Sequence, residues 1–556
     1  MKAPDRGCLL ALALCMTWAW MGASAVSMDS SMGWDEAMHA AWPAARMTIA
    51  IGEWDAAALM RTILDCEQYP FVGPLWTALV WTVTGIGEGA ARGGARVLWG
   101  FGLLGVFLLA REACRGRRGE HLGPWLALAF AAASPLALAF SGTLFLEVPT
   151  TVVAIYTLRA WLRRARGRGD VAAGTWIALL FFTKFNYALA LGAGLVLDLG
   201  FEGAAALRAG GGRRFLRRCA CLASVPCLAW AWWFGLPLPE GLDRAAAHRA
   251  TFMHWITGNT AFEPTPYALR AVHWCVFLVW APRVLLLMAV GSVAAWIGGP
   301  RRATLSLTLV GAVSIGLVSS HPFHLERFLL PLAPALWVLG GTGWASLLPR
   351  ARIAATGSLA ALAAAAFLFP SLDAWWLLDQ VGMRNENALA YQEKVLGDFR
   401  DLSPDRPLFT NGLRRGDFDS MVALVDGAWD GHQRMGWCGM SPTFPPAAVL
   451  IDMLHDEAPV HRALANPGLD RCFVDLGQAD PGWDDARIRQ WAMQFDLLLA
   501  TRPFDLAGPG ARSWIERYQV SLATSGTWAY DKAGATTIIR PNGAEQAVEL
   551  FALRRR

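Results

Sequence analysis

The feature that most constrains this chain is a series of long apolar runs, which fills residues 1 to about 370 and is absent from residues 371–556. A helix of about 20 apolar residues crosses the ~30 Å hydrocarbon core of a bilayer. Only 17% of the residues are charged and the mean hydropathy is +0.34, which excludes a disordered chain and favours a polytopic α-helical membrane protein. About eleven spans are expected, at 8–25, 90–110, 122–141, 145–162, 171–186, 187–203, 219–236, 272–297, 303–320, 327–347 and 352–370.

Arginine-rich loops orient these spans. Five such loops fall on one side of the membrane if the spans alternate, and that side is cytoplasmic because Lys and Arg concentrate there. The N-terminus lies on the same side, and residues 8–25 are expected to be retained as an anchor, with cleavage near Ala25 as the alternative. The loops contain Arg111, Arg115, Arg117 and Arg118; Arg159, Arg163, Arg164, Arg166 and Arg168; Arg208, Arg213, Arg214, Arg217 and Arg218; Arg301 and Arg302; and Arg350 and Arg352.

The apolar segment 70–87 is not counted as a span. Counting it would place every later arginine-rich loop outside, so we interpret it as an interfacial helix. Residues 27–89 then form one extracytoplasmic loop with surface helices at about 34–52 and 70–87. This loop belongs to a transmembrane domain over 1–370, which is followed by a soluble extracytoplasmic domain over 371–556.

The C-terminal domain is expected to be α/β. Short β-branched and apolar runs alternate there with helical stretches. An oxidising compartment would allow a disulfide between Cys438 and Cys472. The expected strands are Pro407–Thr410, Ala448–Asp452, Cys472–Asp475, Phe495–Ala500, Tyr518–Thr524 and Thr536–Ile539.

Adjacent carboxylates, Asp35 and Glu36, follow the first span. Such a pair at a membrane surface can act as a general base and its electrostatic neighbour. The alternative is a helix N-terminus, where acids complement the helix dipole. Both interpretations stay open on these residues alone.

Two further ionisable residues lie at the external ends of spans. Glu147 sits at or within the apolar layer, and no neighbour in sequence supplies a partner for it. Lys184 lies in a very tight connection between two spans and is the only lysine between residues 3 and 393. A solvated turn residue is the alternative for Glu147, and a snorkelling side chain is the alternative for Lys184.

The last candidate group opens the span 327–347. Arg327 suits a phosphate because its planar guanidinium binds oxyanions in a bidentate manner, and His321 and His324 would add donors. A metal site formed by these histidines and Glu326 has a spacing that matches no zinc pattern, and an exposed loop cation is the other alternative.

Transfer from an anionic lipid-phosphate carrier requires both acids and cations, and these candidates place both on one external face. A secondary transporter or flippase is the main rival, although transporters place substrate groups near the bilayer midplane within repeats, and no repeat is visible. A scaffold or sensor acting through the C-terminal domain is a second rival. Nucleic-acid binding is not expected, because the net charge is only +5 and no such motif occurs.

Five short motifs over residues 8–350 carry a resemblance to a known family. The chain resembles the GT-C membrane glycosyltransferases, and among them the bacterial relatives of protein O-mannosyltransferases and of the lipid A aminoarabinose transferase. It departs at His39, where many relatives have Tyr, and at Phe71, where a second Pro is frequent. The motifs are Asp35-Glu36, Tyr69-Pro70, Ser134-Pro135 with Glu147-Val148-Pro149, Thr183-Lys184, and Arg327 before Pro331 and Pro334.

The resemblance implies an inverting glycosyltransferase that moves a sugar from a polyprenyl phosphate to an acceptor hydroxyl. Asp35 would be the general base, while Glu36 and Glu147 would shape the pocket or share that role. Lys184 and Arg327, with His321 or His324, would stabilise the leaving phosphate.

The resemblance also implies the surroundings of the reaction. His39 and Tyr69 would contact substrate or lipid. No cofactor would be required, and a metal is not favoured, although some other GT-C enzymes use one. The implied location is the bacterial inner membrane in the cell envelope, with a periplasmic C-terminal domain. The implied partners are a polyprenyl-phosphate-linked sugar, membrane lipids and an acceptor that stays open: protein, lipid A, glycan or glycolipid.

Overall fold

A computed structural model describes much of the N-terminal two thirds of the chain and parts of the rest. The predicted span 352–370 and the predicted strands 407–410, 448–452 and 518–524 lie outside the described residues. The described residues are 6–22, 36–66, 69–116, 119–134, 137, 140–165, 169–235, 246–253, 282–298, 301–319, 326–347, 415–428, 435–438, 473–475, 496–502, 528–539 and 545–555.

The chain divides into two compact units. Residues 1–26, 63–73 and 93–395 form one, called here the helical unit. Residues 27–62, 74–92 and 396–556 form the other, called here the mixed unit. The predicted domain boundary at residue 370 stays a prediction, because residues 348–414 lie outside the described part.

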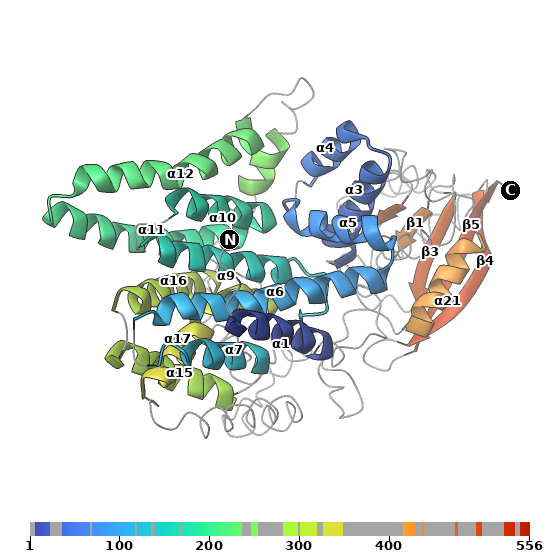
Figure 1. Cartoon of the computed structure of the whole chain (residues 1–556). Helices are drawn as coiled ribbons and strands as arrows, with labels where there is room; N and C mark the ends of the chain where they lie inside the picture. Colours follow the sequence, from blue (N-terminus) through green and yellow to red (C-terminus); the bar gives the residue numbers. More distant parts are fainter. Residues whose placement is uncertain are drawn as a thin grey trace, which may run out of the picture. The chain divides into compact units, whose positions relative to one another are not determined.

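Helices of the helical unit follow the predicted spans closely (Figure 1). Three are long and apolar enough to cross a membrane by length and composition, namely Glu88–Cys114, Phe185–Arg208 and Phe328–Leu347, and shorter apolar helices accompany them. The count of eleven spans therefore stays a prediction. The bounds are α1 Arg6–Gly22, α6 Glu88–Cys114, α7 Gly123–Ala133, α9 Glu147–Arg164, α10 Asp170–Thr183, α11 Phe185–Arg208, α12 Gly212–Gly235, α15 Pro282–Gly298, α16 Arg301–Ser319, η3 Glu326–Leu332 and α17 Ala333–Leu347.

Small residues allow these helices to pack closely. α10 packs against α9, α11 and α12, α16 packs against α11, and α17 packs against α15 and α7. A side chain at Gly343 would collide with the backbone of Gly291 on α15, and one at Gly341 would collide with Ala127 on α7. Packing of this kind holds helices together where no water is present to drive apolar association.

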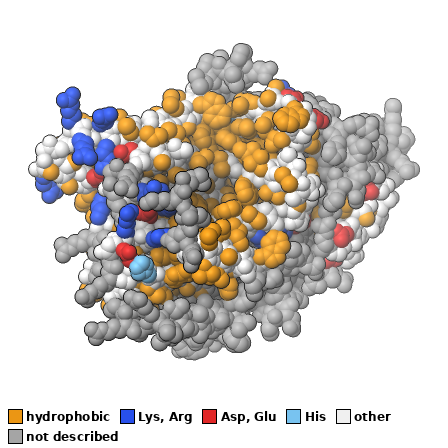
Figure 2. Space-filling view, viewed as in Figure 1, with side chains coloured by type: hydrophobic (Ala, Val, Ile, Leu, Met, Phe, Trp, Pro, Cys, Tyr) orange, Lys and Arg blue, Asp and Glu red, His pale blue; other side chains and the backbone are white. Residues whose placement is uncertain are grey.

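Exposed positions on these helices are strongly apolar. Figure 2 shows hydrophobic side chains spread over much of the visible face. Val196 and Leu207 on α11 are each 69% exposed, and Leu228 on α12 is 71% exposed. Outward-facing residues of this type suit contact with lipid tails better than contact with water.

The mixed unit begins with short helices from the predicted extracytoplasmic loop. The sequence predicts two helices there, and the structure contains an additional one, α4, between them. Thr48 Oγ1 donates to the Ala78 carbonyl at 3.4 Å and so joins α3 to α5. α4, α5 and α6 each run from one unit into the other. The bounds are η2 Ala37–Ala41, α3 Trp42–Gly52, α4 Ala56–Leu64 and α5 Val72–Thr84.

The described C-terminal residues form a five-stranded mixed sheet of order β2-β1-β3-β5-β4, with helix α21 against β4. β1 pairs in parallel with β2 and β3, whereas β5 pairs antiparallel with β3 and β4. The predicted strands 472–475, 495–500 and 536–539 overlap β2, β3 and the end of β4; β1 and β5 were not predicted. Cys472 lies outside the described residues, so the disulfide stays a prediction. The bounds are α21 Arg415–Asp426, β1 Met435–Cys438, β2 Phe473–Asp475, β3 Leu497–Arg502, β4 Trp528–Ile539 and β5 Glu545–Arg555.

Candidate active site

Glu147 and Lys184 come together where three helices of the helical unit begin or end. Glu147 is the first residue of α9, and Lys184 is the single residue between the end of α10 and the start of α11. The Lys184 backbone is extended, with φ −160° and ψ 105°, which breaks the helical path between α10 and α11. The tight connection predicted from the sequence is therefore one residue long.

The two side chains form a buried ion pair. Lys184 Nζ lies 2.8 Å from Glu147 Oε1, and their side chains are 7% and 1% exposed. Neither charge would be stable alone in such a place, because removing a charge from water costs several kcal/mol unless a partner compensates it. The sequence left Glu147 without a partner, and the structure supplies one 37 residues away.

Aromatic rings surround the Lys184 ammonium. Its Nζ lies 4.7 Å from the ring centre of Tyr69, 5.7 Å from that of Tyr187 and 5.4 Å from that of Phe328. Ring faces attract a cation but leave N–H groups available, and an ammonium has three of them. Within the described part of the chain, Glu147 accepts one of them, which leaves donors for an incoming oxyanion. The predicted contact residue Tyr69 thus lies beside the predicted phosphate-binding residue Lys184.

Helix ends add to the electrostatics of this pair. The N-terminus of a helix carries partial positive charge and unpaired N–H groups, which favour anions. Glu147 lies in the first turn of α9 and complements that end. Lys184 directly precedes the N-terminus of α11, so an anion bound to its ammonium would also be attracted by α11.

In the mixed unit, Glu36 belongs to a second buried ion pair. Arg92, 5% exposed, lies between Glu36 at 3.6 Å and Glu88 at 2.8 Å, and Glu36 is 1% exposed. Arg92 was not among the candidate residues predicted from the sequence. Two features of the sequence could have identified it. Arg92 lies near the outer end of the predicted span 90–110, and it follows Glu88 by four residues, a spacing at which opposite charges pair on a helix.

Other predicted site residues lie at or beyond the edge of the described part. Asp35, His321 and His324 lie outside it, and so does the side chain of Arg327, whose backbone belongs to η3. His39 is partly exposed in the π-helical turn η2. Within the described residues, no group of three or more His, Cys, Asp and Glu side chains is arranged to hold a metal ion. The proposed roles of these residues stay predictions.

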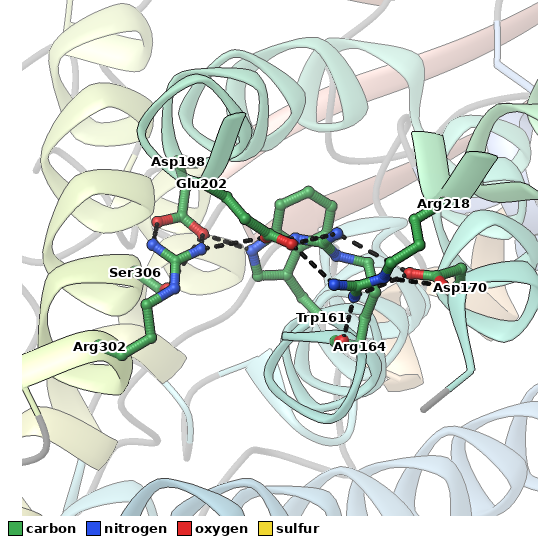
Figure 3. Close-up of polar contacts among 8 residues, drawn as sticks. All are labelled: Trp161, Arg164, Asp170, Asp198, Glu202, Arg218, Arg302 and Ser306. Atoms are coloured by element: carbon green, nitrogen blue, oxygen red, sulfur yellow. Dashed lines mark hydrogen bonds and ion pairs between the residues drawn. The ribbon is translucent and has the colours of Figure 1, made fainter. Parts of the chain in front are cut away.

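A separate charged network lies at the other ends of α9 and α10. Figure 3 shows its side chains, which come from five helices and point toward one another. Asp198 on α11 is fully buried and receives hydrogen bonds from Arg302 at 2.7 and 2.9 Å, from Trp161 at 2.8 Å and from Ser306 at 3.0 Å. All four contacts satisfy one carboxylate.

The remainder of the network joins α9, α10, α11 and α12. Glu202 pairs with Arg164 and with Arg218, the latter at 3.0 Å, and Arg218 also reaches Asp170 at 3.1 Å. Arg164 is fully buried and stacks on the Trp161 ring. The sequence predicts that Arg164 and Arg218 are loop cations. The structure corrects this, because tertiary contacts bury or pair them.

Comparison with solved structures identifies the fold. The chain aligns with the crystal structure of ArnT from Cupriavidus metallidurans bound to undecaprenyl phosphate, with a TM-score of 0.56 and 16% identity, over 98% of this chain and 97% of that one. The apo structure of the same protein aligns over the same shares, with a TM-score of 0.53 and 16% identity. The chain has the fold of ArnT.

This ArnT-like fold confirms the resemblance inferred from the five motifs, since ArnT is the lipid A aminoarabinose transferase, a GT-C enzyme. No protein-family model matches the chain. No curated protein matches it either. With its apolar helices, the fold makes the chain a polytopic α-helical membrane protein, while the eleven spans and the orientation remain predictions.

Proposed function

We propose that the chain is an inverting glycosyltransferase that moves a sugar from a polyprenyl-phosphate carrier to an acceptor hydroxyl on the periplasmic side of the membrane. The observation that carries this proposal is Lys184, a buried cation held by Glu147 at the N-terminus of α11. The ArnT-like fold supports it, because the ArnT crystal structure contains a bound undecaprenyl phosphate.

The leaving group in this reaction is a lipid phosphate. As the bond between the anomeric carbon and the phosphate oxygen breaks, the phosphate gains negative charge. Lys184 would stabilise that charge with the N–H groups that Glu147 does not use. Arg327, with His321 or His324, is proposed to contact the same phosphate. No general acid is needed, because a phosphate already leaves readily as an anion.

The acceptor hydroxyl must lose a proton as its oxygen attacks the anomeric carbon from the opposite face. Asp35 is the proposed base that accepts this proton. Glu36 is less suited to the task, because its carboxylate is 1% exposed and is engaged by Arg92 at 3.6 Å. Glu36 would instead hold the segment that carries Asp35, while His39 and Tyr69 would contact substrate or lipid.

Charge distribution supports the proposed orientation. Arg208, Arg213, Arg214 and Arg217 are exposed around the turn between α11 and α12, where Figure 2 shows Lys and Arg side chains gathered at one end. Lys184 and Glu147 lie at the opposite ends of α10 and α9, and α9 with its 18 residues is about 27 Å long. If the arginine-rich end is cytoplasmic, the ion pair faces the periplasm of a bacterial inner membrane.

The proposal requires no cofactor, and a metal ion is not favoured. The acceptor stays open among a protein, lipid A, a glycan and a glycolipid. The transporter alternative predicts movement of substrate without cleavage of the sugar–phosphate bond, so a cleavage assay separates the two functions.

The test uses purified protein in lipid nanodiscs with a panel of polyprenyl-phosphate sugars, an acceptor-rich membrane extract, and release of lipid phosphate as the readout. We expect turnover by the wild type and a loss of about 10²-fold or more in Lys184→Ala, as for removal of one group that stabilises a developing anion. Asp35→Asn should abolish turnover. Arg163→Ala serves as the matched control, because Arg163 is an exposed cation on the same helix as Glu147, with a side chain that is 51% exposed.

Two outcomes would count against the proposal. Full activity in Lys184→Ala would remove this cation from phosphate stabilisation. No release from any donor by the wild type would favour the transporter or binding alternatives.

A further inference from the structure

His248 is a buried histidine that the proposed reaction does not use. It lies in the described segment 246–253 of the helical unit and is 2% exposed. Its Nδ1 lies 3.2 Å from the Trp233 carbonyl oxygen, and its Nε2 lies 2.7 Å from the Leu64 carbonyl oxygen. Each ring nitrogen therefore faces an atom that only accepts hydrogen bonds.

Two facing acceptors fit the doubly protonated ring better than the neutral ring. A neutral imidazole carries one N–H group, so one of the two carbonyls would face a nitrogen lone pair. The doubly protonated ring donates to both carbonyls at once. The ring also lies flat on the Trp233 indole, with centroids 4.1 Å apart and an interplanar angle of 4°, and an aromatic face attracts a cation.

These contacts tie His248 to the segment that carries Tyr69. Leu64, whose carbonyl accepts from His248, ends α4 just before this segment. After Tyr69, the Phe71 ring packs on Trp233 at 6.1 Å, and Trp233 is the residue on which His248 stacks. His248 and Trp233 thus hold residues 64–71 on both sides of Tyr69, and Tyr69 lies against the Lys184 ammonium.

Few other charges lie on the elements around His248. α4 carries Arg61, which pairs with Asp55 at 3.8 Å, and the exposed Asp65 follows Leu64. Residues 222–235 of α12 contain no charged side chain. Within its own segment, Arg249 donates to the Phe234 carbonyl. Within the described residues, the His248 ring therefore contacts mainly the two carbonyls and the Trp233 ring.

We propose that His248, when doubly protonated, is a positioning residue that clamps residues 64–71 so that Tyr69 stays against Lys184. The clamp is closed while the ring donates to both carbonyls and weakens when the ring loses its second proton, so raising the pH opens it. Periplasmic pH would thereby regulate how well Lys184 is presented to the lipid phosphate. This inference rests on the proposed function for its activity readout only.

The experiment compares wild type, His248→Gln, His248→Arg and the control His121→Gln, whose histidine is exposed in the turn before α7. Arginine keeps a planar cation with several donors at every pH, whereas glutamine has no charge. We expect lipid-phosphate release by the wild type to fall by on the order of tenfold from pH 6 to pH 8.5 relative to His248→Arg. His248→Gln should be low throughout, and His121→Gln should match the wild type. Asp35 and other groups titrate in every variant, so the comparison with His248→Arg isolates His248.

A second readout does not depend on turnover. It is hydrogen–deuterium exchange of peptides covering residues 64–71, corrected for the intrinsic effect of pH on exchange. In the wild type, these peptides should be protected at pH 6 and lose protection at pH 8.5. In His248→Gln they should be unprotected at both pH values, and in His248→Arg they should be protected at both. Failure of the proposed function would leave this exchange pattern intact. Equal protection of 64–71 in the wild type at both pH values, or in His248→Gln, would overturn the clamp. So would a wild-type pH profile in a folded His248→Arg.

Discussion

At the scale of single residues, the main features are two buried ion pairs, Lys184–Glu147 and Arg92–Glu36. Each carboxylate is 1% exposed, and each faces a cation that lies far away in sequence. Burial makes such pairs sensitive, because removing one partner leaves a charge in a place from which water is excluded. The acids were recognisable in the sequence, since carboxylates at the ends of apolar spans are rare. Their partners were not assigned, because the choice of partner depends on the packing of other helices.

Arg92→Ala is expected to destabilise the protein and lower its activity. It removes the cation that lies between Glu36 and Glu88, and breaking a buried ion pair costs about 3–5 kcal/mol. Thermal unfolding should therefore begin at a lower temperature. Adding Glu36→Gln to Arg92→Ala should recover part of that loss, because the buried charge that Arg92 compensated is then removed as well. Strictly additive effects in this double-mutant cycle would show that the two residues are not coupled.

At the scale of helices, the charged network around Asp198 links the helices of the bundle to one another. It joins α9, α10, α11, α12 and α16 with three acids and three arginines, so its charges balance (Figure 3). Gly169, with φ 81°, adopts the left-handed conformation just before α10, and Asp170, the first residue of α10, lies 3.8 Å from Arg164. Local sequence therefore brings part of the network together, and tertiary packing adds the rest.

Asp198→Asn is expected to lower stability more than Ser306→Ala does. The amide keeps the shape but loses the charge that compensates Arg302, and we expect about 2–3 kcal/mol, below the value for a fully buried pair because Arg302 is 37% exposed. Ser306→Ala removes one neutral hydrogen bond, at about 1 kcal/mol. Thermal unfolding in nanodiscs measures both variants. Equal effects would mean that the charge of Asp198 contributes nothing beyond its hydrogen bonds.

The whole molecule combines a membrane-embedded helical unit with a mixed unit that contains a five-stranded sheet. Its ArnT-like fold extends over 98% of the chain even though sequence identity is only 16%. At the scale of the whole molecule, the best test is whether the intact protein binds the proposed lipid ligand. A ligand that binds only the folded state raises the unfolding temperature, and the stabilisation grows with the logarithm of the ligand concentration divided by the dissociation constant.

Undecaprenyl phosphate is expected to stabilise the full chain by about 2.7 kcal/mol at 100 times its dissociation constant. The expected effect is an upward shift of the thermal transition in the wild type and a much smaller shift in Lys184→Ala, because Lys184 is the proposed phosphate contact. Undecaprenol, which has the same tail without the phosphate, is the matched control. Equal stabilisation by the two lipids would contradict phosphate recognition.

Sequence by itself determined the order and approximate bounds of the described helices of the helical unit, because long apolar runs have few stable alternatives to membrane helices. It also marked Glu147 and Lys184 as unusual, since ionisable groups are rare at such positions. Several features depended on tertiary structure: the pairing of those two residues, the role of Arg92, the burial of Arg164 and the two carbonyls around His248. The contacts of Lys184 with Glu147, of Arg92 with Glu36, of Arg164 with Glu202 and of His248 with its two carbonyls join residues 15 to 184 positions apart, and contacts over such separations depend on how the helices pack rather than on any local pattern.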